Sequence, residues 1–206
     1  VCNPIRRDRI SWLHSCFHEA IDLHHPATYP WQDTEYLAFV HHKAVITNGW
    51  VFWDHENVLK HAGFLREFFA LTPKHSAIVG TYLAKCRQQS SIVVGVHIRR
   101  GDYQIAAGGV HFHSISEYAA LMRKVEKLFA SPICFLVCSD EKWAPSDFPG
   151  LSVVFGPGDA VLDMYSLAAC DYIAGVPSTF SGWASFYGQT PLYFIYDMQK
   201  AQQAVN

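Results

Sequence analysis

A polar run follows an apolar segment in the stretch VVGVHIRRGDY, residues 93–103. The side chains that could do chemistry in this run are those of His97, Arg99, Arg100 and Asp102. An arginine guanidinium offers a rigid fork of N–H donors that matches phosphate oxygens two at a time. The run therefore predicts a local site for an anion such as a phosphate group.

The two arginines are adjacent, so their side chains point to opposite sides if the strand continues through them. We expect one of them to face a ligand and the other to anchor a carboxylate such as Asp102 or Asp140. A surface arginine–aspartate pair that closes the strand is the alternative interpretation of the motif in isolation. Its place after a buried strand favours a functional role.

Two more polar groups lie where predicted helices begin. Pro177, Ser178 and Thr179 lead into a helix, and a helix N-terminus offers free N–H groups and a positive dipole end to a phosphate. Ordinary capping by serine or threonine is the alternative. Asp163 lies near the start of another helix, where its carboxylate could accept the N1–H and N2–H groups of guanine. Stabilisation by the helix dipole is the alternative for this aspartate.

The second half of the chain alternates predicted strands with predicted helices. Strands are expected at 92–98, 133–138, 151–155, 171–176 and 191–196, and helices at 115–129, 160–169, 179–188 and in the tail. Ser114 and Glu117 form a capping box before the first of these helices. Such alternation predicts a parallel sheet that binds ligands beyond the carboxyl ends of its strands. Ser139 and Asp140 should therefore join the arginines at one edge.

The first half has a less regular pattern. Helices are predicted at 8–24, 54–70 and 76–88, and one or two short strands at 36–47. No apolar run reaches the roughly 18 residues that a membrane helix needs. No signal peptide is evident, and because the chain starts without methionine we expect its true N-terminus to be missing.

Composition indicates a globular protein, since 50% of the 206 residues are hydrophobic and 17% are charged. The formal net charge of −2 excludes a global basic field for nucleic acid, so an anion site must be local. The six cysteines include no CxxC pair, which argues against a zinc site or a disulfide framework. Cys134 and Cys138 are interpreted as buried free thiols, which are typical of a reducing compartment.

Three blocks of the sequence resemble the motif blocks of the alpha-1,2-fucosyltransferases, glycosyltransferase family 11. They are HIRRGDY (97–103), CSDEKW (138–143) and LDMYSLAACDYIAGVPSTFSGWASFYG (162–188), in matching order and spacing. The segment NGWVFWDHENVLKHAGFLREFF (48–69) resembles the one that precedes the first block. More distantly, the blocks are similar to motifs of alpha-1,6- and protein O-fucosyltransferases. The Gly-rich GGLGNQ-type segment that usually opens such proteins has no counterpart here.

The resemblance implies an α/β fold of the GT-B type, with a Rossmann-like parallel-sheet donor domain and a shortened N-terminal part. It places a partial acceptor-side domain at 1–90 and the GDP-sugar-binding domain at 91–206. The implied reaction is metal-independent, inverting transfer of fucose to a galactose hydroxyl of a glycan or surface polysaccharide. GDP-fucose is the donor substrate, and no cofactor, metal or nucleic acid is implied.

The resemblance also implies roles for single residues. Arg99 would contact the diphosphate and stabilise the departing GDP, His97 would lie against the nucleoside, and Asp163 would recognise guanine. The remaining residues expected to bind substrate are Arg100, Ser139, Asp140, Ser178, Thr179 and Phe180. Asp102 is the nearest candidate for a general base, with His111 and His113 as alternatives, although a dissociative mechanism needs little base.

Other readings follow from other residues. The missing Gly-rich segment keeps open a non-catalytic module that binds nucleotide sugar or glycan. His14 and His18, with Glu19 beside them, suggest a metal site, but no HExxH is present. A nicotinamide-dependent oxidoreductase would need a GxGxxG that is missing after the first strand. A bacterial member would be cytoplasmic or peripheral to the inner membrane, and a eukaryotic one lumenal in the Golgi. The sequence assigns no oligomeric state.

Overall fold

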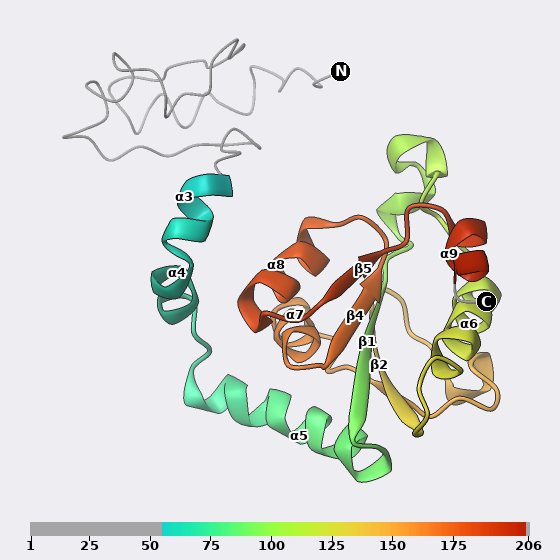
Figure 1. Ribbon diagram of the computed structural model, residues 1–206, viewed down its shortest axis with the longest axis horizontal. Helices are drawn as coiled ribbons and strands as arrows, with labels where there is room; N and C mark the ends of the chain where they lie inside the picture. Colours follow the sequence, from blue (N-terminus) through green and yellow to red (C-terminus); the bar gives the residue numbers. More distant parts are fainter. Residues whose placement is uncertain (1–54, 205–206) are drawn as a thin grey trace. The chain divides into compact units, whose positions relative to one another are not determined.

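The computed structural model describes residues 55–204 of the chain (Figure 1). The helix predicted at 8–24 and the strands predicted at 36–47 lie outside the described residues. The chain divides into two compact units, residues 1–65 and 66–206. Only the last turns of the first unit are described, and the second unit contains the whole sheet.

Two short helices begin the described part. Helix α3 spans His55–Lys60, and α4 spans Ala62–Phe68, so that α4 continues into the second unit. The prediction that residues 54–70 are helical is confirmed for most of this range, although a turn at His61 divides it into two helices. Gly63 lies two residues after this turn, and glycine weakens a helix through its large backbone freedom.

A parallel sheet forms the centre of the second unit. Within the described residues its strands are β1 (Ile92–Ile98), β2 (Ile133–Ser139), β3 (Val153–Phe155), β4 (Tyr172–Gly175) and β5 (Leu192–Phe194). Their order is β3-β2-β1-β4-β5, and every neighbouring pair is parallel. The order reverses between β1 and β4, which is where open α/β sheets bind ligands. The predicted α/β fold with a Rossmann-like sheet is confirmed.

Helices cover both faces of this sheet (Figure 1). On one face lie α5 (Pro73–Gln89), α7 (Ala160–Ala168) and α8 (Thr179–Gly188), and on the other lie α6 (Ile115–Glu126) and α9 (Met198–Ala204). Successive β1 residues alternate between the two layers. Val94, Val96 and Ile98 pack with α6 and α9, whereas Val93 packs with α5 and α7. The same alternation directs the side chains of Arg99 and Arg100, just after β1, to opposite faces of the sheet.

The helix starts are fixed by side-chain caps. Ser114 and Glu117 form the predicted capping box of α6. Thr72 caps α5, so that this helix begins earlier than the predicted residue 76. Asp159 caps α7 by accepting two backbone N–H groups, each at 3.0 Å. Ser178 caps α8 by accepting the N–H group of Phe180.

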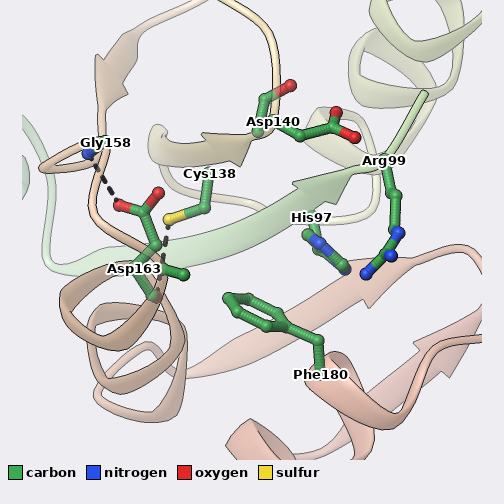
Figure 2. A pocket seen from close by; sticks show the side chains of 9 residues that line it. His97, Arg99, Cys138, Asp140, Gly158, Asp163 and Phe180 are labelled. Carbon is green, nitrogen blue, oxygen red and sulfur yellow. Dashed lines mark hydrogen bonds between the residues drawn. The ribbon is translucent and has the colours of Figure 1, made fainter. Parts of the chain in front are cut away.

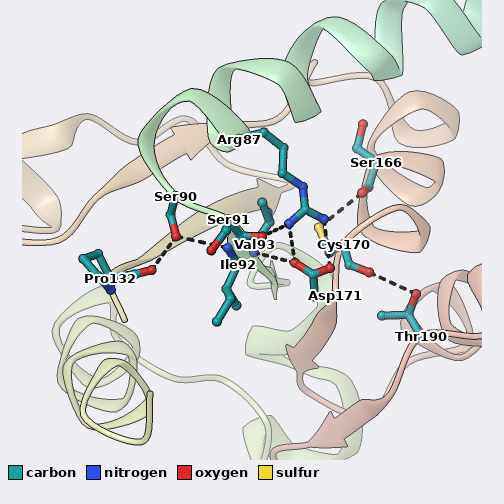
Figure 3. A network of polar contacts seen from close by, with 10 residues as sticks. All are labelled: Arg87, Ser90, Ser91, Ile92, Val93, Pro132, Ser166, Cys170, Asp171 and Thr190. Atoms are coloured by element: carbon teal, nitrogen blue, oxygen red, sulfur yellow. Dashed lines mark hydrogen bonds and ion pairs between the residues drawn. The ribbon is translucent and has the colours of Figure 1, made fainter. Parts of the chain in front are cut away.

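A polar network ties the start of β4 to the start of β1 (Figure 3). Both oxygens of Asp171 accept from Arg87, at 2.6 and 2.8 Å. One of these oxygens also accepts the backbone N–H of Val93 at 2.7 Å. Because Val93 lies at the amino end of β1, this network holds the sheet at the edge opposite to the polar motif residues.

Helix α5 packs against β2 and α7, although it lies before the domain boundary predicted at residue 90. That boundary stays a prediction, because most of the proposed first domain is outside the described part. Cys86, Cys134, Cys138 and Cys170 are buried free thiols, as expected for the two that we considered.

Neither a membrane-spanning helix nor a metal-binding cluster is found among the described residues. No helix between residues 55 and 204 is long and apolar enough to cross a membrane. In the same part of the chain, no group of three or more His, Cys, Asp or Glu side chains is arranged to hold a metal ion. His14 and His18, which suggested a metal site, lie outside the described residues.

Candidate functional site

A pocket of about 290 Å³ opens at the carboxyl edge of the sheet (Figure 2). It is lined by His97, Arg99, Cys138, Ser139, Asp140, Gly158, Ala160, Asp163 and Phe180. These residues come from the ends of β1 and β2, from α7 and the loop before it, and from the start of α8. The three motif blocks therefore meet in one hollow, as their positions after the strands predict.

Arg99 provides the positive charge of the pocket. Its Nε and Nη2 atoms donate to the two oxygens of Asp102, each at 2.9 Å. The guanidinium also lies over the ring of Tyr103, 5.1 Å from the ring centroid. The hydrogen-bonded carboxylate raises the pKa of Arg99, and the guanidinium lowers the pKa of Asp102. One edge of the guanidinium is held in this way, and within the described part of the chain Nη1 has no hydrogen-bond partner and can meet a ligand.

Arg100 points to the other side of the sheet, as strand alternation predicts. Its guanidinium contacts the rings of Phe112 and Trp143, at 4.5 and 5.4 Å from their centroids. Its Nε is 3.0 Å from a carboxylate oxygen of Glu141, and Nη1 donates to the His113 carbonyl at 3.0 Å. The structure thus keeps the guanidinium of Arg100 out of the pocket, although we expected it to bind substrate.

The carboxylates near the arginines have other partners than expected. Asp102 pairs with the arginine that lines the pocket, and not with its neighbour. Asp140 accepts the backbone N–H groups of Arg100 and Gly101, at 3.0 Å each. The outward arginine does anchor a carboxylate, as expected, but its guanidinium pairs with Glu141 and not with Asp102 or Asp140. Asp140 fixes the turn after β1 and lines the pocket at the same time.

His97 forms the centre of the pocket (Figure 2). It is 5% exposed, and its ring stacks on Phe180 with centroids 4.6 Å apart and an interplanar angle of 26°. Nδ1 lies 2.7 Å from the hydroxyl of Ser181. Burial, assisted by the charge of Arg99, lowers the pKa of His97 to about 4. The imidazole is therefore neutral at physiological pH.

Asp163 provides the negative charge at the other end. It is 5% exposed, and one carboxylate oxygen accepts the N–H of Gly158 at 3.0 Å. Burial raises the pKa of this carboxyl. A Cβ on Gly156 would lie 2.6 Å from the same oxygen, so glycine is required there for Asp163 to hold this position. Asp159 is the cap of α7, and Asp163 lies in the first turn, so stabilisation by the helix dipole stays an alternative for this carboxylate.

The start of α8 meets the loop after β1. The hydroxyl of Tyr103 donates to the carbonyl of Pro177 at 2.6 Å, which fastens this loop to the turn before α8. Ser178 and Thr179 belong to that turn and its helix start, but they do not line the pocket as Phe180 does. Ser178 uses its side chain as the helix cap.

Ser139 ends β2 at the pocket wall. Its hydroxyl accepts the backbone N–H of Glu141 at 3.1 Å and the indole N–H of Trp143 at 3.0 Å. Both bonds lie within the CSDEKW block, so this serine shapes the loop that presents Asp140 to the pocket.

Sequence reasoning missed three pocket residues: Cys138, Gly158 and Ala160. Cys138 pairs with His97 in the register of β1 and β2. The alternation of side chains between the two faces of the sheet could therefore have identified it. Gly158 and Ala160 flank the cap of α7, where no chemically reactive side chain draws attention. His111 and His113, the alternative bases, do not line the pocket, and burial lowers the pKa of His113.

The pocket can therefore bind a ligand that is anionic at one end and offers N–H donors at the other. Figure 2 shows Asp163 and Arg99 at opposite ends, with His97 and Phe180 between them. A cation with a free edge suits a phosphate oxygen, and a buried carboxylate suits a pair of N–H donors. The neutral imidazole of His97, between these two charged groups, can form a hydrogen bond to a ligand without adding a charge.

Comparisons with known proteins agree with the motif blocks. The model of glycosyl transferase family 11 matches residues 17–204. No curated protein matches the chain. A similar solved structure is the crystal structure of POFUT1 in complex with GDP, with 15% identity and a TM-score of 0.45. The similarity covers 58% of this chain and 46% of that one, and it is too distant to support an argument about the site.

Proposed function

We propose, since this chain belongs to glycosyltransferase family 11, that it transfers fucose from GDP-fucose to a galactose hydroxyl of a glycan or surface polysaccharide. The single observation that carries the proposal is the placement of Arg99 and Asp163 in one pocket at the carboxyl edge of the sheet. The alpha-1,2 linkage and inversion at the sugar carbon come from the resemblance of the motif blocks. We propose them together with the reaction.

The donor would lie along the pocket with its guanine at Asp163. The carboxylate would accept the N1–H and N2–H groups of the base, and its buried position makes both bonds strong. The nucleoside would lie beside His97 and Phe180, whose stacked rings offer an apolar surface. The pyrophosphate would then reach Arg99 and the start of α8.

The chemistry follows from where charge develops. The acceptor hydroxyl oxygen attacks C1 of fucose, and the bond from C1 to the phosphate oxygen breaks with its electron pair leaving on GDP. The departing diphosphate gains negative charge, which the guanidinium of Arg99 and the N–H groups at the start of α8 stabilise. The hydroxyl proton leaves to solvent or to a base.

In this proposal Asp102 positions Arg99, and it is a weak candidate for the base. Its two oxygens are occupied by Arg99, and the ion pair lowers its pKa, which makes it a poorer proton acceptor. His111 and His113 stand outside the pocket lining. A dissociative transition state, in which the hydroxyl stays protonated until late, fits such a site.

Nucleotide binding tests the donor assignment. Calorimetry with GDP, UDP and ADP should show binding of GDP and a clear preference over the other two nucleotides. Asp163→Asn should reduce the preference for GDP over ADP by about ten- to a hundredfold, because an amide presents only one acceptor to the guanine edge. Asp147→Asn makes the same chemical change outside the pocket and should leave the preference intact. Equal affinity for GDP and ADP in the unchanged chain would reject the assignment.

Turnover separates an enzyme from a binding module. GDP-fucose with a galactoside acceptor should yield GDP and the fucosylated product, which mass spectrometry and NMR of the new linkage identify. Binding of GDP without product from any galactoside would favour the non-catalytic module that the sequence left open.

A further inference from the structure

Behind the His97 ring lies a serine that the motif resemblance did not single out. Ser181 belongs to α8 and is fully buried, and its hydroxyl lies 2.7 Å from Nδ1 of His97. Gly175, which stands opposite His97 in the sheet register, leaves room for this contact. A Cβ on Gly175 would lie 3.0 Å from the Cβ of His97 and 3.2 Å from the Ser181 hydroxyl.

Proton counting gives this contact a direction. Among the described residues, Nδ1 is the hydrogen-bond partner of the Ser181 hydroxyl, and no carbonyl accepts from it. A buried hydroxyl proton without an acceptor would destabilise the folded protein, so the proton of Ser181 must point to Nδ1 of His97. Nδ1 then accepts, and the single proton of a neutral imidazole resides on Nε2.

We propose that Ser181 is a positioning residue that holds His97 as the Nε2–H tautomer, with this N–H directed to an oxygen of the bound nucleotide. The part of the inference that concerns the nucleotide rests on the proposed function. An N–H donor beside Arg99 suits an anionic phosphate oxygen, whereas a bare nitrogen lone pair would repel it. Ser181 thereby determines whether the ring attracts or repels the donor substrate.

The surroundings of the ring make the tautomer decisive. Burial and the nearby Arg99 lower the pKa of His97 to about 4, while Asp140 opposes this shift. A doubly protonated ring would donate from both nitrogens and would not need Ser181, but the neutral ring has one N–H only. Phe180 stacks on the ring face, so adjacent residues of one helix hold the imidazole by its face and by its edge.

Nitrogen NMR of the histidine rings tests the tautomer directly. In the full chain labelled with ¹⁵N-histidine, the His97 ring is assigned by its loss in His97→Gln. We expect its Nε2 to be protonated and its Nδ1 to be unprotonated near neutral pH, without any nucleotide. Ser181→Ala should convert this single form into a mixture of tautomers. A free protein with the proton on Nδ1, or an unchanged spectrum in Ser181→Ala, would overturn the proposal.

GDP binding supplies the second readout. Ser181→Ala should weaken GDP binding by about tenfold, because the Nε2–H donor is no longer fixed. Ser185→Ala is the matched control, since that hydroxyl donates from the same helix to the Thr190 carbonyl and lies outside the pocket. It should keep both the His97 spectrum and the affinity. If the unchanged chain binds no GDP, the proposed function fails, and the tautomer in the free protein still decides the role of Ser181.

Discussion

Arg99 and Asp102 form an ion pair whose geometry limits what each residue can do. Two parallel bonds of 2.9 Å hold the guanidinium, which is 36% exposed, and leave its Nη1 edge to a ligand. A carboxylate used in this way keeps its negative charge, because its pKa is lowered by the guanidinium. The pair is therefore better suited to binding an anion than to taking up a proton.

Asp102→Asn distinguishes positioning from base catalysis. Because the pair is partly exposed, we expect GDP affinity to fall by roughly two- to fivefold, and turnover by less than about tenfold. Loss of a general base would instead lower turnover by about 10²–10⁴-fold. Steady-state kinetics at saturating donor separates the two, with Asp197→Asn, outside the pocket, as the control. A fall in turnover within the larger range would restore Asp102 as the base.

The pH dependence of this pair has a definite sign. Since the pKa of Asp102 is lowered, its carboxylate is fully charged at any pH above the ordinary carboxyl pKa. It is protonated, and its ion pair with Arg99 is lost, only as the pH falls through the lowered pKa. The ratio of GDP affinities between the wild type and Asp102→Asn should therefore be constant from about pH 6 to 8.

Single residues show where sequence reasoning stops. Alternation along β1 could separate Arg99, on the side of His97, from Arg100 on the other. The partner of Arg100 could not be chosen from the sequence, because Glu141 and Trp143 come near it only through the pairing of β1 with β2. The contact between Ser181 and His97 likewise depends on how α8 packs against β1.

At the scale of the elements, the sheet is held at both of its edges. The carboxyl edge carries the pocket, and the amino edge carries the network around Asp171 (Figure 3). Arg87 and the backbone N–H of Val93 both lower the pKa of Asp171. The charged Asp171 therefore stabilises the folded chain at any pH above the ordinary carboxyl pKa, and this stabilisation is lost as the pH falls through the lowered pKa of Asp171.

Asp171→Asn should destabilise the chain without affecting the pocket. We expect a loss of about 1 kcal/mol in the free energy of unfolding at neutral pH, since the ion pair is over one-third exposed and one backbone N–H loses a charged acceptor. The difference from the wild type should shrink on acidification. Urea unfolding measures both effects, and GDP affinity should stay unchanged. An equally stable variant at neutral pH would refute this role.

The strength of local patterns explains which elements were predicted. The continuous valine-rich run predicted the bounds that β1 has in the structure, and the segment after Ser178 predicted those of α8. The capping box of α6 was also visible, because both of its residues are close in sequence. The turn at His61 within the expected helix at 54–70 had no comparable signal.

For the whole molecule, the strand order explains why separate motif blocks form one site. Because β1 is central and the order reverses beside it, the ends of β1, β2 and β4 meet at one edge. Alternating strands and helices predicted the parallel sheet, and the match to family 11 confirms the family that the motif blocks indicated. The sequence could not give the depth of the pocket, since burial of His97 and Asp163 arises only when both helix layers pack.

The most direct test of the account is calorimetric titration of GDP into the wild type and Arg99→Ala. Arg123→Ala serves as the control, because it removes a guanidinium that lies outside the pocket. We predict that the wild type and Arg123→Ala bind GDP equally, and that Arg99→Ala, still folded by circular dichroism, binds about a hundredfold more weakly. Arg99→Ala that binds GDP as tightly as the wild type would contradict the account.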